Sequence, residues 1–87
     1  MALLKNKVCI ITGGAGSIGL ASARRFLDEG ARVMLVDLDA SNLAKAVDGL
    51  DSERVATCVA DVSDAVQVQK FIDETVSRWG EIDVIFR

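Results

Sequence analysis

The chain of 87 residues is long enough for one small domain, and its 10 basic and 13 acidic side chains give a net charge of −3. A domain of this length buries only about 60–65% of the surface that its unfolded chain exposes, so we expect a small margin of stability. The acidic balance argues against a nucleic-acid-binding module, because little here would neutralise a phosphate backbone. Histidine is absent, which excludes histidine acid–base chemistry and histidine-containing zinc sites. The apolar runs are too short to span a membrane.

The amino-terminal segment and the cysteines indicate the cellular compartment. Residues 1–7 hold too short an apolar stretch for a signal peptide, so we expect a cytoplasmic protein. Cys9 and Cys58 fall in the first and third of the strands predicted below. If those strands lie two places apart in a sheet, a spacing of about 4.8 Å per strand separates the cysteines by roughly 10 Å, beyond disulfide reach. We therefore expect both cysteines to act as small buried hydrophobic residues.

Short apolar runs alternate with longer amphipathic segments along the whole chain. The apolar runs are of the kind that parallel sheets bury on both faces, and they predict four strands, at about residues 7–12, 32–37, 54–60 and 82–86. Thr57 interrupts the third run, which makes it the weakest of the four. No repeat or linker divides residues 1–87, so we interpret them as one domain.

Three amphipathic segments predict helices between these strands. The first runs over residues 17–29 and ends at Gly30, since glycine commonly follows a last helical turn. The third is the longest and ends at Gly80. The sequence leaves two N-caps open between neighbouring residues, which are Asp39 or Ser41 for the short second helix and Ser63 or Asp64 for the third.

Alternating strands and helices predict a parallel sheet joined by right-handed crossovers. The expected spatial order is 3-2-1-4, with the first two helices on one face and the third helix on the other. This arrangement is half of a doubly wound Rossmann sheet of the α/β class, with three helices. Ligands of such sheets bind where the strand order reverses, beyond the carboxyl ends of the strands, so we expect a site there.

A glycine-rich stretch follows the first strand and opens the first helix. Its glycines are Gly13, Gly14, Gly16 and Gly19. A turn of this kind brings bare backbone N–H groups close to an anion, and the helix dipole favours negative charge at the same place. The stretch therefore predicts the pyrophosphate cradle of a dinucleotide site. The alternative is a tight turn that needs glycine only for backbone conformation and close packing.

Asp37 ends the second strand, where a dinucleotide site needs an acceptor for the ribose hydroxyls. A carboxylate there accepts hydrogen bonds from the 2′-OH of NAD and repels the 2′-phosphate of NADP. NADP would require a basic side chain, and the candidate positions Ala15, Ser17 and Leu38 hold none, so we expect NAD. The alternative role for Asp37 is a helix cap or a solvated loop residue, which Asp39 could equally fill.

The stretch resembles the Thr-Gly-x-x-x-Gly-x-Gly cofactor motif of the short-chain dehydrogenase/reductase family, through Thr12-Gly13 and Gly16-Ser17-Ile18-Gly19. Asp61-Val62 after the third strand, and the run from Trp79 to Val84 before the fourth, agree with the family in order and place. The resemblance implies that Asp61 and the backbone of Val62 contact the adenine ring, and that Ile18 lies beside the pyrophosphate. Without the resemblance, Asp61 and Asp83 would be interpreted as strand-end caps. The predicted cofactor-binding residues are Gly13, Gly16, Ser17, Ile18, Gly19, Asp37, Leu38, Asp61 and Val62.

The sequence also departs from the family. Members continue the fourth strand into Asn-Asn-Ala-Gly, and Arg87 stands where the first asparagine would fall. The family's catalytic Ser and its Tyr-x-x-x-Lys pair have no counterpart, since the chain contains no tyrosine. The resemblance therefore implies the NAD(H)-binding N-terminal portion of an alcohol or carbonyl oxidoreductase that is inactive alone. We expect neither catalytic residues nor metal ligands in it.

The fourth strand predicts an exposed apolar edge with unpaired backbone groups, formed by Ile82, Val84, Ile85 and Phe86. We expect a homo-oligomer that covers this edge. The alternative function is a non-catalytic isoform or fragment that acts as an interaction module through the same strand. A third interpretation is a nucleotide-binding domain of another class, such as half of a methyltransferase.

Overall fold

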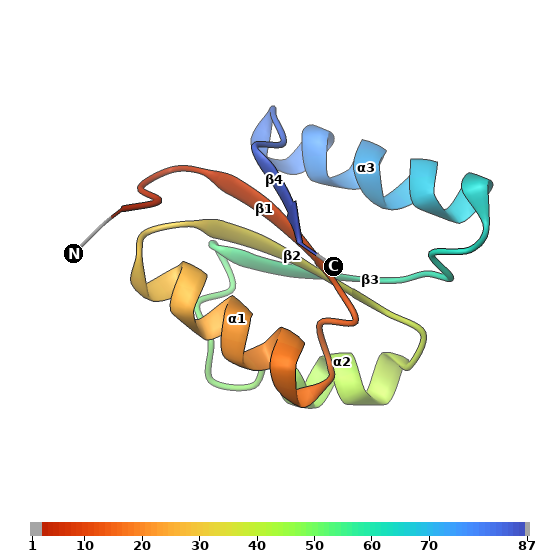
Figure 1. Cartoon of the computed structure of the whole chain (residues 1–87), viewed down its shortest axis with the longest axis horizontal. Helices are drawn as coiled ribbons and strands as arrows, with labels where there is room; N and C mark the ends of the chain where they lie inside the picture. The colour runs from red at the N-terminus through yellow and green to blue at the C-terminus, as the bar shows by residue number, and fades with distance from the viewer. Residues whose placement is uncertain (1–2, 87) are drawn as a thin grey trace.

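Strands and helices alternate along the chain in the computed structural model, which describes residues 3–86 (Figure 1). The strands are β1 (Val8–Thr12), β2 (Arg32–Asp37), β3 (Val55–Val59) and β4 (Val84–Phe86). The helices are α1 (Ser17–Asp28), α2 (Ala40–Ala46) and α3 (Ala65–Trp79). Arg87, where the sequence departs from the family's asparagine, and the first two residues of the amino-terminal segment lie outside the described residues.

The four strands form one parallel sheet in the order β3-β2-β1-β4, so the predicted topology is confirmed. In the register of the sheet, Ile10 of β1 lies opposite Met34 of β2 on one side and Ile85 of β4 on the other. The residues from Val8 to Ile11 are fully buried. This burial explains the continuous apolar run of β1, because helices cover both faces of the sheet.

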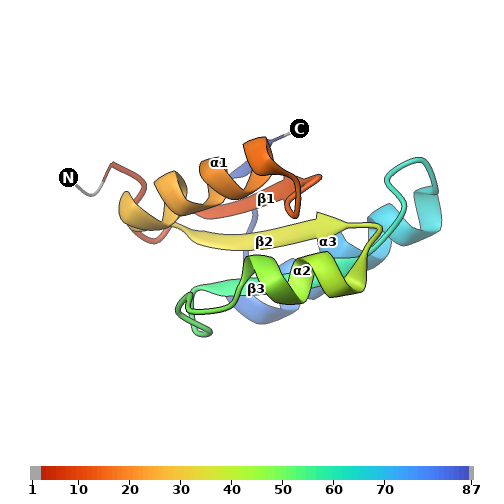
Figure 2. The ribbon, with the colours of Figure 1, turned by 90° about the horizontal axis from the view of Figure 1, so that it is seen from below.

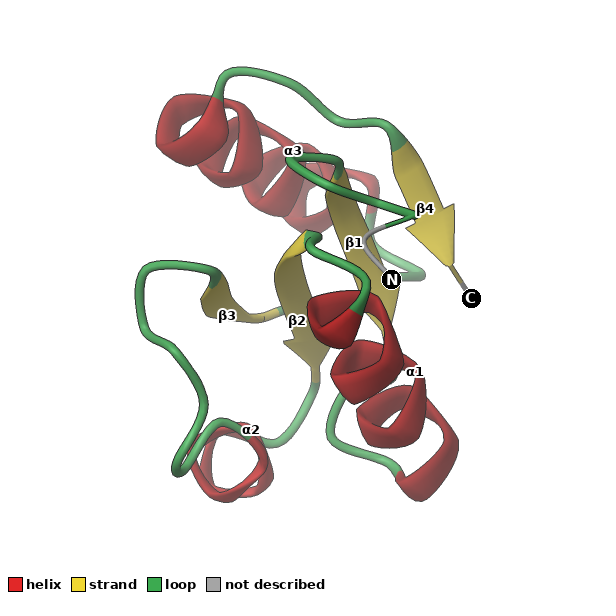
Figure 3. Cartoon of the chain, turned by 90° about the vertical axis from the view of Figure 1, so that its left-hand side faces the viewer, coloured by secondary structure: helices red, strands yellow, loops and turns green. Residues whose placement is uncertain are grey.

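Helices α1 and α2 cover one face of the sheet and α3 covers the other, as Figures 2 and 3 show from two directions. The alternation of side chains along each strand divides the core accordingly. Cys9, Ile11, Val33 and Leu35 pack with Ala23 of α1 and Leu43 of α2. Ile10, Met34, Val36 and Cys58 pack with Phe71 of α3. The reversal of strand order beside β1 therefore sends α3 to the second face.

The two cysteines lie on opposite faces of the sheet. Cys9 belongs to the core cluster under α1 and α2, and Cys58 belongs to the cluster under α3. Both are free and buried, as predicted. Burial is the main cause that raises the pKa of each thiol above its ordinary value, with the Asp83 carboxylate adding to it at Cys9 and Glu74 at Cys58. Both side chains are therefore neutral packing groups at neutral pH.

Two aspartates cap the later helices and resolve the open N-caps. The Asp39 carboxylate accepts from the N–H groups of Ser41 and Asn42, and it begins α2. The Asp64 carboxylate accepts from the N–H groups of Val66 and Gln67, and it begins α3. Each carboxylate satisfies backbone donors that a helix leaves unpaired at its first turn.

Strand β4 begins at Val84, two residues later than its apolar run predicts, and Asp83 before it bonds to β1 through both its backbone and its side chain. The Asp83 N–H donates to the carbonyl of Val8 at 2.8 Å, and its carboxylate Oδ2 accepts from the N–H of Val8 at 2.8 Å. Asp83 is thus the strand-end cap that the residues alone suggested. Ile82, which was predicted to lie in the strand, packs instead against the core cluster under α3.

The predicted apolar edge of β4 is only partly exposed. Val84 and Ile85 are 37% and 49% exposed. Phe86 is half-buried, because its ring meets Phe26 of α1 edge-on with the centroids 5.8 Å apart. The prediction that all four residues are exposed is therefore wrong for Ile82 and Phe86, and correct for Val84 and Ile85.

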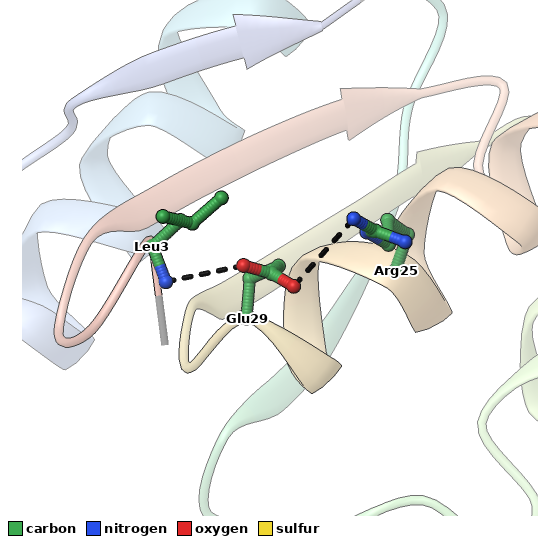
Figure 4. A network of polar contacts seen from close by, with 3 residues as sticks. All are labelled: Leu3, Arg25 and Glu29. Carbon is green, nitrogen blue, oxygen red and sulfur yellow. Dashed lines mark hydrogen bonds and ion pairs between the residues drawn. The ribbon is translucent and has the colours of Figure 1, made fainter. Parts of the chain in front are cut away.

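The segment before β1 is tied to the end of α1 (Figure 4). The Glu29 carboxylate accepts from the N–H of Leu3 at 3.1 Å and pairs with the Arg25 guanidinium at 3.7 Å. The N–H of Leu4 donates to the backbone carbonyl of Glu29 at 2.8 Å. The Arg25 side chain of this ion pair is 72% exposed and the Glu29 side chain 12% exposed. None of the helices in residues 3–86 is long and apolar enough to cross a bilayer.

Candidate functional site

The loops after β1, β2 and β3 all leave the same edge of the sheet, at the right-hand end in Figure 1. In a parallel sheet the carboxyl ends of all strands meet at one edge, so residues far apart in the sequence become neighbours there. A shallow hollow of about 160 Å³ lies between these loops, on the β2–β3 side of the glycine turn. It is lined by Gly13, Val36, Asp37, Leu38, Ala60, Asp61 and Val62.

The glycine turn is held against β2 by its own backbone. Gly13 has a φ of +68°, in the left-handed region that glycine adopts at little cost. The N–H of Gly14 donates to the carbonyl of Val36 at 3.0 Å, and the N–H of Gly16 donates to that of Gly13 at 3.1 Å. A Cβ at Gly14 would lie 2.9 Å from the side chain of Leu35. The turn therefore closes tightly over the end of the sheet.

Gly19 sets the distance between α1 and this turn. A Cβ on Gly19 would lie 2.3 Å from the carbonyl oxygen of Gly13 and 2.9 Å from Cα of Gly14. Neither contact can be relieved by turning a side chain, because both neighbours are backbone atoms. Gly16 differs, since a Cβ there would come no closer than 3.4 Å to the carbonyl oxygen of Gly13. The packing explanation offered for the glycines thus holds for Gly19 and not for Gly16.

Among the three helices, α1 has the N-terminus whose backbone N–H groups find the fewest acceptors in the described residues. Its N-cap, Gly16, has no side chain to accept a hydrogen bond, and the first turn contains no acidic residue. The N–H groups of Ser17, Ile18 and Gly19 find no acceptor among residues 3–86. The helices α2 and α3 both fill this place with an aspartate. Unpaired donors and the positive end of the helix dipole favour an anion at α1.

Asp37 joins the glycine turn to the end of β2. Its Oδ2 accepts from the N–H of Ala15 at 3.2 Å, and its Oδ1 accepts from the N–H groups of Leu38 and Asp39 at 2.7 and 3.3 Å. The helix-cap role considered for Asp37 belongs to Asp39, whose pKa is lowered chiefly by the hydrogen bond from the N–H of Asn42. Asp37 therefore holds a carboxylate beside the anion site without serving a helix.

Asp61 follows β3 on the opposite wall of the hollow. Its Oδ1 accepts from the hydroxyl of Ser63 at 2.6 Å and from the N–H of Ser63 at 2.9 Å. These two hydrogen bonds hold the pKa of Asp61 below its ordinary value, and the bond from the Ser63 hydroxyl contributes more than the bond from the Ser63 N–H. The neighbouring Val62 side chain is 55% exposed and borders the same hollow. This wall therefore offers an ionised acceptor beside an apolar surface.

The structure brings together five of the nine predicted residues in one hollow, which are Gly13, Asp37, Leu38, Asp61 and Val62. Ser17 and Ile18 lie in the first turn of α1, where Ile18 is 76% exposed. Gly16 caps that turn, and Gly19 lies behind it against the backbone. Counted from Thr12-Gly13, the second glycine of the family motif falls on Ser17, so the chain carries a side chain where the motif has none.

Sequence reasoning missed two participants. Ala15 was weighed only as a position for a basic side chain, yet its N–H donates to Asp37. Gln67 was not singled out, yet its side-chain Oε1 accepts from the N–H of Asp61 at 2.7 Å. A signal for Gln67 exists in the sequence, because Asp64-x-x-Gln67 has the spacing of a helix capping box.

Larger hollows lie along the outer edge of β3, away from the glycine turn. Their volumes are about 500 and 310 Å³, and both are bordered by Ala56, Thr57 and Arg78. They have no glycine turn and no helix N-terminus among their lining residues, so the chemistry of the site does not extend to them. No cluster of three or more potential metal ligands occurs within residues 3–86.

The different roles of Gly19 and Gly16 predict different stabilities for their alanine variants. Gly19→Ala should lower the free energy of unfolding by about 1–3 kcal/mol, because the added methyl group forces α1 away from the turn. Gly16→Ala is the matched control and should lower the free energy of unfolding by only about 0.5 kcal/mol, because alanine is a somewhat poorer N-cap than glycine. Urea denaturation followed by circular dichroism measures both. Equal losses in the two variants would contradict the packing role of Gly19.

Comparison with known proteins agrees with this geometry. A family model described as short chain dehydrogenase matches residues 7–87. Levodione reductase of Leifsonia aquatica is 43% identical over 86 residues, covering 93% of this chain and 32% of the reductase. A short chain dehydrogenase/reductase from Burkholderia phymatum, solved in complex with NAD, has a TM-score of 0.89 and 31% identity, over 98% of this chain and 31% of that one. The C-domain of bacterial malonyl-CoA reductase, solved with NADP, has a TM-score of 0.87 and 32% identity, over 97% of this chain and 14% of that one.

The chain spans about a third of the length of the curated relatives it matches. The family model covers the glycine turn, all four strands and all three helices. The solved relatives have the same fold over nearly the whole chain. The chain therefore belongs to the short-chain dehydrogenase family.

Proposed function

We propose that this chain binds the adenosine diphosphate part of NAD(H), as the coenzyme-binding portion of an alcohol or carbonyl oxidoreductase. The observation that carries the proposal is Asp37, a carboxylate held against the glycine turn by the N–H of Ala15 and bordering the hollow. An acceptor at this place suits the ribose hydroxyls of a dinucleotide whose pyrophosphate lies at the N-terminus of α1. The family supports the same assignment, since the Burkholderia relative was solved with NAD.

Each part of the ligand has a matching group. The unpaired N–H groups of Ser17, Ile18 and Gly19 would hold the pyrophosphate, and Ile18 would lie beside it. The hollow between Leu38 and Asp61 would take the adenine ring, with the Asp61 carboxylate free to accept from the amino group of the base. A bound nicotinamide cofactor supplies hydride transfer, and residues 3–86 contribute its binding and orientation.

The charge around the hollow favours NAD over NADP. Asp37 and Asp61 border it, and no basic side chain is among its lining residues. A 2′-phosphate near Asp37 would bring like charges together without a cation to offset them. Relatives have been solved with either cofactor, so the preference rests on this chain's own side chains.

The Asp37→Asn variant tests this preference. Asparagine keeps one of the two accepting oxygens, places an amide NH2 group where the other accepts from backbone N–H groups, and loses the charge, so NAD affinity should fall by about tenfold and NADP affinity should change less or rise. Titration calorimetry with both cofactors gives the ratio. Asp39→Asn is the matched control, because it removes the neighbouring charge and keeps a good N-cap for α2. If both variants shift the ratio equally, net charge and not Asp37 sets the preference.

We also propose that the chain binds the cofactor without turning over substrate by itself. Its sequence contains no tyrosine and no histidine to transfer the proton that accompanies hydride transfer to or from an oxygen. Purified chain incubated with NAD and a panel of primary and secondary alcohols should therefore form no NADH above the rate without protein. NADH absorbance measures this. Sustained formation of NADH would overturn the proposal.

A second proposal concerns the edge of β4, for which the exposed Val84 and Ile85 are the evidence. In the sheet that residues 3–86 form, β4 is an outer strand, and its outer side presents backbone groups that pair with no other strand of these residues. A second copy of the chain could pair with it about a two-fold axis and cover both side chains. This surface would make the chain a homo-oligomer, and it is also the surface that an interaction module would use.

Sedimentation equilibrium at micromolar concentration tests this interface. The parent chain should sediment as a dimer or larger species, and Ile85→Lys should sediment as a monomer, because a buried unpaired charge is costly. Val66→Lys is the control, since Val66 is 79% exposed on α3, away from β4. A monomeric parent chain, or equal dissociation by both variants, would contradict the proposed interface.

A further inference from the structure

Gln67 lies at a helix capping position, but its side chain accepts from a residue that precedes the N-cap. It occupies the third position of α3 after the N-cap Asp64, where a glutamine ordinarily returns to the N–H of the N-cap residue. Here the N–H of Asp64 donates instead to the carbonyl of Asp61 at 3.1 Å. The Gln67 Oε1 reaches further back and accepts from the N–H of Asp61 at 2.7 Å. Its Nε2 donates to the Asp64 carboxylate at 3.2 Å, which fixes the orientation of the amide.

Asp61 follows β3, the strand at the lateral edge of the sheet. This position explains why the backbone N–H of Asp61 needs the Gln67 side chain as its acceptor. Successive backbone N–H groups of a strand point to opposite sides, and the N–H of Ala60 points to β2, where it donates to the backbone carbonyl of Asp37 at 3.0 Å. The N–H of Asp61 therefore points to the outer side of β3. That strand is the last on its side of the sheet, so no neighbouring strand can accept the bond. The side-chain oxygen of Gln67 accepts the hydrogen bond that a neighbouring strand would otherwise accept.

The bond is not required to begin the helix. The Asp64 carboxylate already accepts from the N–H groups of Val66 and Gln67. Helix α2 begins with the same two-bond aspartate cap, and Asn42 at its third position makes no comparable backward bond in the described residues. The side chain of Gln67 therefore acts on the loop before the helix and not on the helix itself.

We propose that Gln67 is a positioning residue that fixes the Ala60–Asp61 peptide, and with it the Asp61 carboxylate and Val62, as one wall of the adenine pocket. This inference rests on the proposed function, because it assigns the hollow between Leu38 and Asp61 to the adenine ring. Fixing the peptide restricts the direction in which the Asp61 carboxylate faces the base. Gln67 thereby controls how well the site distinguishes a base that carries an amino group from one that does not.

The test compares two dinucleotides in one titration series. NAD carries the adenine amino group, and nicotinamide hypoxanthine dinucleotide carries a carbonyl oxygen there, which repels a carboxylate. The parent chain should bind NAD more tightly than this analogue. Gln67→Met keeps the length of the side chain and removes the acceptor, so the affinity ratio should fall by about threefold to fivefold. Gln69→Met is the matched control, because Gln69 bonds only to Asp73 on the exposed side of α3, and its ratio should stay unchanged.

A second measurement on the ligand-free chain separates the two proposals. Amide hydrogen exchange at Asp61, followed by nuclear magnetic resonance, should become about fivefold faster in Gln67→Met and stay unchanged in Gln69→Met. Unchanged exchange in Gln67→Met would overturn the positioning role whatever the ligand does. Faster exchange with an unchanged affinity ratio would overturn the link to the adenine pocket. A parent chain that binds neither dinucleotide would overturn the proposed function, and the pocket role of Gln67 with it.

Discussion

The contact between α1 and the glycine turn is the constraint on which the rest of the site depends. Gly19 meets the backbone of Gly13 and Gly14 at a distance that leaves no room for a Cβ atom. This contact sets where the helix begins, and so where its unpaired N–H groups point. Because the turn is bonded to β2 through Gly14, the helix N-terminus is also placed relative to Asp37. Several tight backbone contacts are thus concentrated at the carboxyl end of the sheet.

The parallel sheet converts a linear order of segments into a site. The glycine turn, Asp37 and Asp61 lie at the carboxyl ends of three different strands, and only parallel pairing brings all three strand ends together. Strand β3 lies at the lateral edge of the sheet. Its backbone N–H and C=O groups that point away from β2 therefore have no neighbouring strand to bond with. The first turn of α3 solves this at Asp61 through a glutamine side chain. Helix α3, which covers one face of the sheet, therefore also supplies the acceptor for the backbone N–H of Asp61 at the lateral edge of the sheet.

Four aspartates lie at the carboxyl end of the sheet, and they have two different roles. Asp39 and Asp64 cap helices, and their oxygens are turned to backbone N–H groups. Asp37 accepts from the N–H of Ala15 in the glycine turn, Asp61 accepts from Ser63 in its own loop, and both keep a carboxylate at the hollow. The concentration of negative charge, with no basic side chain lining the hollow, suits hydroxyl and amino donors better than a phosphate. The N-terminus of α1, whose N-cap is a glycine without a capping side chain, is the place that favours an anion.

The sequence by itself determined the order of the elements, the two-faced burial of the strands, the sheet order and the strand-end position of Asp37, because periodicity and turn chemistry are local properties of the chain. Only the tertiary structure decided the role of Asp37, because the N–H of Ala15 from which its carboxylate accepts lies 22 residues away in the chain. It also decided that Ile82 and Phe86 are half-buried, because Ile82 packs against a core cluster that contains Ile10 and Met34, and Phe86 meets Phe26 of α1. The role of Gln67 depends on β3 being an edge strand. Such assignments depend on distances between segments, which no local pattern contains.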